Sequence, residues 1–296
     1  MMNFKTKLSK VINKYAFLKT LHAAYLFIFS SHRITFVKYP SFEGWGMTTT
    51  TRTPWQNNGD HALTKSFFEA DSKLKNLVKT KEFVLSQFPE MFPELDQMKF
   101  LDELNWRHYI VFWSSTYAVK NTKSKQKNLV ECGVCDGLTS YYAISAVKSL
   151  NKICNAYLYD AWDAMKENLL LNSEKSYDGQ YSYLDVKATE KNLDMFDSDK
   201  LFFNKGYIPD SFKVSKNPKS LVWLHIDLNA SLPTLDSLNF FWNKLENGGI
   251  VLFDDYALPG YEDTQRLIEE WVVDKNGTVL HLPTGQAIII KNQFDD

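Results

Sequence analysis

Residues 128–142 constrain the fold of this chain more than any other part of its sequence. They read N-L-V-E-C-G-V-C-D-G-L-T-S-Y-Y, with a short apolar run, an acid at Glu131 and two glycines before apolar residues resume at helical spacing. Glycine lets a backbone turn sharply and approach a ligand, and the helix start beyond it offers free N–H groups. The pattern predicts a strand, a turn and a helix around a nucleotide-like cofactor.

The spacing within this turn separates two classes of cofactor. Gly133 and Gly137 enclose three residues, and Cys135 stands where the dinucleotide fingerprint has the glycine that admits a pyrophosphate. NAD is therefore disfavoured. An acid-x-G-x-x-x-G turn after the first strand resembles that of class I S-adenosylmethionine-dependent methyltransferases. A strand, turn and helix with two glycines is also an ordinary joint of α/β proteins, so the turn needs support from the rest of the chain.

Beyond residue 128, apolar runs of strand length alternate with helical patterns, which is typical of a doubly wound parallel sheet in an α/β protein. The predicted strands cover residues 129–132, 156–159, 201–204, 221–226 and 250–253. The clearest predicted helix covers residues 234–246, with Ser231 as its cap and Gly248-Gly249 at its end. A final helix near residues 263–273 precedes two extended runs, 278–282 and 287–291.

The first part of the chain has a different character. Residues 3–30, 60–88 and 95–119 have helical patterns, and residues 36–58 form a loop that holds Trp45 and Trp55. That loop is either a lid over a substrate pocket or a segment pinned to the core by its tryptophans. The predicted division is an N-terminal region of helices and lid, 1–122, and a catalytic domain, 123–296.

Charge and cysteine usage narrow the compartment and the partners. The formal net charge is -1, with 34 basic and 35 acidic residues, so no overall field favours nucleic acid. Three cysteines, without a secretion signal, predict a reducing, cytoplasmic location, and Cys132 and Cys135 lack a second pair for zinc. The apolar run 21–30 is shorter than the ~20 residues of a membrane span. We expect a small-molecule acceptor, no nucleic acid and no stable membrane insertion, and homo-oligomerisation stays open.

Aspartates close several of the predicted strands, where an open α/β sheet binds its ligands. Asp160 ends the second strand and can accept both ribose hydroxyls of an adenosine, although it could also cap the following helix. Asp227, Asp254 and Asp255 end the fourth and fifth strands. Three converging carboxylates repel one another unless a cation or a proton lies among them, and oxygen ligands favour magnesium or calcium. Each could instead cap a helix or pair with a basic side chain.

A more specific resemblance rests on six segments in order: E-C-G-V-C-D-G, Y-D-A-W-D, N-K-G-Y-I-P-D-S-F, L-H-I-D-L-N-A-S-L-P-T, N-G-G-I-V-L-F-D-D-Y and L-P-T-G-Q-A-I-I-I-K. Over residues 128–291 the chain resembles the macrocin O-methyltransferase family, class I enzymes that methylate sugar hydroxyls with S-adenosylmethionine and magnesium. The resemblance implies a Rossmann-like sheet. It also implies cofactor contacts at Glu131, Gly133, Gly137 and Asp160, and metal ligands at Asp227, Asp254 and Asp255.

The predicted function is methyl transfer to a hydroxyl, expected to belong to a sugar, with Asp227 as the base that accepts the hydroxyl proton. The chain departs from the family's D-x-D-x-Y at Asn229, which removes one carboxylate. A metal-dependent hydrolase would explain the acids but would leave the glycine turn and Asp160 without a role. A non-catalytic binding module would tolerate loss of the acids, yet all three are present.

Overall fold

The computed structural model describes residues 105–196, 200–275 and 277–292, which belong to the compact unit Asn58–Asp296. The lid and the helices predicted before residue 105 lie outside the described residues. The domain boundary predicted between residues 122 and 123 stays a prediction.

Seven strands of the described residues form one sheet in the order β3-β2-β1-β4-β5-β7-β6. Their bounds are β1 Lys127–Cys132, β2 Cys154–Asp160, β3 Leu201–Lys205, β4 Leu221–Ile226, β5 Leu245–Phe253, β6 Leu280–His281 and β7 Ala287–Ile290. The first five strands, β1 to β5, pair in parallel, as predicted. The last two run antiparallel, so the sheet is mixed rather than wholly parallel, and the predicted α/β class is confirmed.

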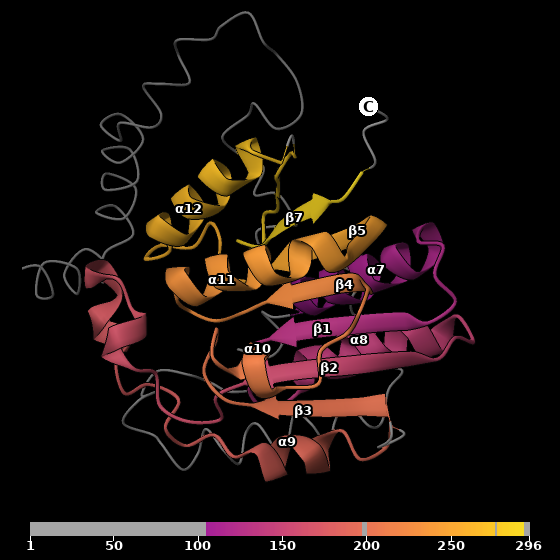
Figure 1. Ribbon diagram of the computed structural model, residues 1–296, viewed down its shortest axis with the longest axis horizontal. Coiled ribbons are helices and arrows are strands. Elements are labelled where there is room, and N and C mark those ends of the chain that lie inside the picture. Colours follow the sequence, from indigo (N-terminus) through magenta and orange to yellow (C-terminus); the bar gives the residue numbers. More distant parts are fainter. Residues whose placement is uncertain (1–104, 197–199, 276, 293–296) are drawn as a thin grey trace, which may run out of the picture. The chain divides into compact units, whose positions relative to one another are not determined.

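Helices cover both faces of this sheet (Figure 1). One face packs against α7 Asn105–Asn121 and α8 Leu138–Ser149, and the other against α10 Ser211–Val214, α11 Ser231–Phe241 and α12 Glu262–Val273. Successive strand residues alternate between the two cores, as Leu129 and Val130 do, because side chains along a strand point to opposite faces. Within the described ranges, no helix combines the length and apolar character that crossing a bilayer requires.

The helix predicted over residues 234–246 is wrong at both ends. It begins at Ser231 and its α-helical part ends at Phe241, followed by a 3-10 turn at Trp242–Lys244. Leu245 already belongs to β5 and pairs with Leu221. The two glycines predicted to end the helix therefore lie inside a strand, where Gly248 has φ 82. The ammonium of Lys291 donates to the carbonyls of Trp242 and Leu245, both at 2.7 Å, and so joins the 3-10 turn to the start of β5.

The predicted cap of this helix is also corrected. Ala230 is the residue at the N-cap, and it makes no side-chain cap bond. Instead the buried carboxylate of Glu174 accepts the backbone N–H of Ser231 at 2.9 Å and the hydroxyl of the same residue. A negative group at a helix N-terminus is favourable, so Glu174 caps α11 from a distant part of the chain.

Backbone bonds hold the carboxyl ends of the strands side by side. Gly133 N–H donates to the carbonyl of Tyr159 at 2.8 Å, and Asp227 N–H to that of Cys132 at 2.8 Å. Asp254 N–H donates to Ile226 at 3.0 Å. The residues that follow β1, β4 and β5 are thereby brought to one edge of the sheet, which is where ligands bind in this fold.

Candidate active site

A cavity of about 510 Å³ opens at this edge. The turn after β1 forms one part of its lining, and the ends of β4 and β5 form another. The predicted residues that line it are Gly133, Asp160, Asp227, Asp254 and Asp255, whereas Glu131 and Gly137 do not. Cofactor-sized space and the carboxylates thus belong to one cavity.

The glycine turn packs tightly against the loop after β4. Gly133 has φ 86, a backbone conformation that L side chains rarely adopt, and a methyl group on it would overlap the carbonyl oxygen of Asp227. Gly137 has φ 91 and stands at the N-cap of α8. Glycine is therefore favoured at both positions by the positive φ. At Gly133 it is also required because a larger side chain would overlap the backbone of Asp227.

The side chain of Asp160 binds backbone N–H groups of the glycine turn. Its Oδ2 accepts N–H groups from Val134 at 2.7 Å and Cys135 at 2.8 Å, and its Oδ1 accepts that of Trp162 at 2.6 Å. Burial raises the pKa of Asp160, while the three N–H donors act in the opposite direction. The carboxylate therefore holds the turn in shape from the end of β2, and a ribose contact at this residue stays a prediction.

Glu131 lies beneath the cavity in a buried network. Its two oxygens bind the hydroxyl of Ser140 and, at 3.1 Å, the Nδ1 of His225. Burial raises the pKa of Glu131, opposed by these two partners. Glu131 is 1% exposed and holds the side chains of Ser140 and His225 in place beside the cavity. A direct cofactor contact at Glu131 stays a prediction.

His225, which the sequence analysis did not single out, connects Glu131 to the carboxylates. Its Nε2 lies 3.8 Å from Asp254 Oδ1, which is an ion-pair distance rather than a hydrogen bond. Burial alone would lower the pKa of His225, but the carboxylates of Asp254 and Glu131 raise it to about 10. His225 stands two residues before Asp227, and side chains two residues apart at a strand end point to the same face. That spacing was the signal in the sequence that could have identified His225.

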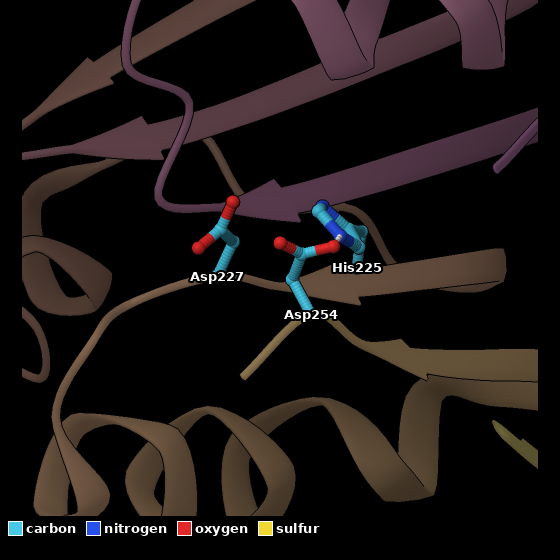
Figure 2. A group of neighbouring side chains, drawn as sticks. All are labelled: His225, Asp227 and Asp254. Carbon is cyan, nitrogen blue, oxygen red and sulfur yellow. Dashed lines mark ion pairs between the residues drawn. The ribbon is translucent and has the colours of Figure 1, made fainter. Parts of the chain in front are cut away.

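Asp254 is the central carboxylate of the cluster. Figure 2 shows its side chain between those of His225 and Asp227, and one ligand atom from each of these three residues lies within 4.8 Å of the others. The amide of Gln286 donates to Asp254 Oδ1 at 2.7 Å, and the guanidinium of Arg107 pairs with Oδ2. Burial acts against ionisation, but Arg107 and His225 hold the pKa of Asp254 well below its ordinary range.

Asp227 and Asp255 have the opposite electrostatic environment. Burial and the charge of Asp254 raise the pKa of Asp255 to about 6, and burial with the neighbouring carboxylates raises that of Asp227 well above its ordinary value. The charge of Asp255 contributes to the raised pKa of Asp227. Two acids this close together need either a proton or a cation to relieve their repulsion.

The donor set fits a hard divalent cation. Where Glu131 and His225 are both ionised, their charges compensate each other, so the three aspartates face one guanidinium and retain two negative charges when all are ionised. Oxygen ligands with that excess charge are what magnesium or calcium prefers. Asp227 and Asp254 are the carboxylates that would hold such an ion, because the described ligand atoms that lie within 4.8 Å of one another belong to these two residues and His225. Asp255 is not in that group, so a metal contact at Asp255 stays a prediction.

The departure at Asn229 has a structural role. Asn229 adopts φ 52, a left-handed conformation that asparagine tolerates better than most residues. Its N–H donates to Asp255 Oδ2 at 3.2 Å, and its side-chain oxygen accepts the hydroxyl of Tyr261 at 2.5 Å. The residue thus positions Asp255 through its backbone rather than adding a carboxylate.

The connection between β2 and α9 Val186–Asn192 supplies another wall of the cavity, which the sequence analysis did not identify. Its lining residues are Ala161, Asp163, Met165, Lys166, Leu169, Leu170, Tyr181, Tyr183, Leu184 and Asp185. Tyr181 has φ 64, and burial with the charges of Asp227 and Asp255 raises its pKa. An aromatic side chain is therefore held beside the carboxylates in an unusual backbone conformation.

Comparison with known proteins identifies similar folds. Residues 130–256 match the family model described as a methyltransferase domain, and no curated protein matches the sequence. The solved structure of the O-methyltransferase NovP has a TM-score of 0.55 at 15% identity, over 63% of this chain and 80% of that chain. The structure of CalS11, a calicheamicin methyltransferase, has a TM-score of 0.52 at 14% identity, over 84% and 99%. The fold is thus that of class I Rossmann-like methyltransferases.

Proposed function

We propose that this protein is an S-adenosylmethionine-dependent O-methyltransferase that acts on a sugar hydroxyl of a small molecule, assisted by a divalent cation such as Mg²⁺. One observation carries the proposal. The backbone of Asp227 packs directly against Gly133, so the carboxylate cluster adjoins the turn that would bind the cofactor. The match of residues 130–256 to a methyltransferase domain supports the same reaction.

In this proposal the two parts of the cavity have separate tasks. The glycine turn, whose N–H groups at Val134 and Cys135 are held by Asp160, shapes the part of the cavity that binds and orients the cofactor, which supplies an activated methyl group on a sulfonium. A cation held by the aspartates would make the acceptor hydroxyl more acidic, and Asp227 would accept the proton that this hydroxyl loses on methyl transfer.

Two observations support a sugar as the acceptor: the resemblance described above and the cavity wall beside the carboxylates. The resemblance to macrocin O-methyltransferases favours a glycoside, and the similar structures include an O-methyltransferase and a calicheamicin methyltransferase. Tyr181 offers an apolar ring beside two carboxylates, an arrangement suited to the C–H face and the hydroxyls of a pyranose.

Cofactor binding tests this proposal and separates it from a metal-dependent hydrolase. We expect calorimetric titration of the full-length protein to show saturable binding of S-adenosylmethionine and of S-adenosylhomocysteine. Asp160→Ala should weaken binding at least tenfold, because it removes charge-assisted bonds of about 1.5–3 kcal/mol each that hold the turn.

Asp194→Ala is the matched control, since Asp194 is exposed and lies outside the cavity lining. It should bind the cofactor as the wild type does. Undiminished binding by a folded Asp160→Ala variant would remove Asp160 from the cofactor site, and no binding by the wild type would refute the methyltransferase proposal.

A further inference from the structure

Arg107 reaches the carboxylate cluster from α7 and is held there by backbone atoms. Its Nη1 donates to the carbonyl of Thr284 at 2.9 Å, and its Nη2 to the carbonyl of Asp254 at 3.0 Å. The same Nη2 pairs with Asp254 Oδ2. Because two carbonyls fix the guanidinium, it remains beside the cluster whether or not the carboxylate is engaged elsewhere.

The charge of Arg107 acts on the whole cluster. Its side chain is 14% exposed, and it interacts electrostatically with Asp227 and Asp255 as well as with Asp254. Charges interact more strongly in a buried site than in water, so a fixed guanidinium attracts the carboxylates and repels a second cation. The guanidinium and a divalent ion are therefore alternative means of neutralising the same three acids.

We propose that Arg107 is a resident counter-ion of the cation site, which holds the carboxylates together through Asp254 and thereby lowers the affinity with which they bind a divalent ion. This inference rests on the cation of the proposed function. It assigns Arg107 a positioning role that neither the sequence pattern nor the methyltransferase match specifies. Because Arg107 lowers the affinity of the site, we expect a bound cation to exchange with cations in solution rather than to stay bound permanently.

Mn²⁺ binding by the full-length protein tests the inference without any acceptor. In Arg107→Gln we expect the affinity for Mn²⁺, measured by calorimetry and by electron paramagnetic resonance, to rise at least tenfold. The midpoint of thermal unfolding in EDTA should fall by several degrees and should recover when Mn²⁺ is saturating, because ligand binding stabilises the folded state. Arg107→Lys, which keeps the charge, should change the affinity less than threefold.

A double-mutant cycle asks whether the effect passes through Asp254. In an Asp254→Asn background, Arg107→Gln should raise Mn²⁺ affinity clearly less than tenfold, because the carboxylate that the guanidinium occupies is absent and only the charge effect on Asp227 and Asp255 remains. A tenfold gain that persists in that background would contradict the role of Asp254. An unfolding midpoint that Mn²⁺ fails to restore in Arg107→Gln would mean that the arginine is only structural.

The remaining outcomes are also decisive. Unchanged or weaker Mn²⁺ affinity in folded Arg107→Gln overturns the inference, as does a wild type that binds no Mn²⁺. Should Arg107→Gln and the second charge-free variant, Arg107→Met, fold only with Mn²⁺, the inference is supported; should they fail to fold even then, it is wrong. Titration with S-adenosylhomocysteine in the same samples shows independently whether the proposed methyltransferase function stands.

Discussion

Replacing Asp227 by asparagine should lower the rate of methyl transfer by about 10² to 10⁴, the range in which a positioned base contributes. The substitution keeps the shape of the side chain but removes the charge that would accept the hydroxyl proton. Asp227 adjoins both Gly133 and the other carboxylates. Its loss should therefore affect methyl transfer itself, which takes place where the cofactor part and the carboxylate part of the cavity adjoin. Chelation of divalent cations by EDTA should also abolish transfer, and added Mg²⁺ should restore it.

The measurement is transfer of radiolabelled methyl groups from S-adenosylmethionine to a panel of pyranosides. Asp194→Asn is the control, because this exposed residue lies outside the cavity lining. Binding of S-adenosylhomocysteine by Asp227→Asn should stay within threefold of the wild type, which would separate catalysis from cofactor binding. Unchanged turnover in EDTA would contradict the cation, and full activity of Asp227→Asn with Mg²⁺ present would contradict the base.

Gly133→Ala should destabilise the protein by about 3 kcal/mol or more and abolish measurable cofactor binding. Alanine at φ 86 costs about 1–2 kcal/mol in backbone strain, and its methyl group would overlap the carbonyl oxygen of Asp227. That carbonyl belongs to a backbone fixed by the bond from Asp227 N–H to Cys132, so relief requires movement of the strand ends themselves. Urea denaturation and calorimetry with S-adenosylhomocysteine measure the two effects.

Gly179→Ala separates strain from overlap. Gly179 has a similar φ, 78, but a methyl group there would meet nothing within 4 Å. This variant should lose only the backbone cost, about 1–2 kcal/mol, and should bind the cofactor normally. Equal destabilisation of the two variants would show that the close approach of Gly133 to Asp227 has no energetic consequence.

The departure of α11 from its predicted bounds shows where local patterns fail. Residues 234–246 have a helical apolar face, yet Leu245 joins β5 because pairing with Leu221 in the sheet outweighs a helical propensity of a few tenths of a kcal/mol per residue. Gly248 resembled a helix terminator because glycine favours any positive φ, including one within a strand. Residue type predicted the unusual backbone conformation but not the element that contains it.

The sequence by itself determined the parallel strands, the glycine turn and the aspartates at the strand ends. These features depend on short-range patterns of apolar residues and on the alternation of strands with helices, which makes the strands run in one direction. Only the tertiary structure decided what the acids contact. Arg107 reaches Asp254 across 147 positions of the chain, Glu131 meets His225 across 94, and the carboxylate of Asp160 binds backbone N–H groups rather than standing free. Contacts between residues so far apart depend on how helices and strands pack, and neither spacing nor composition encodes that packing locally.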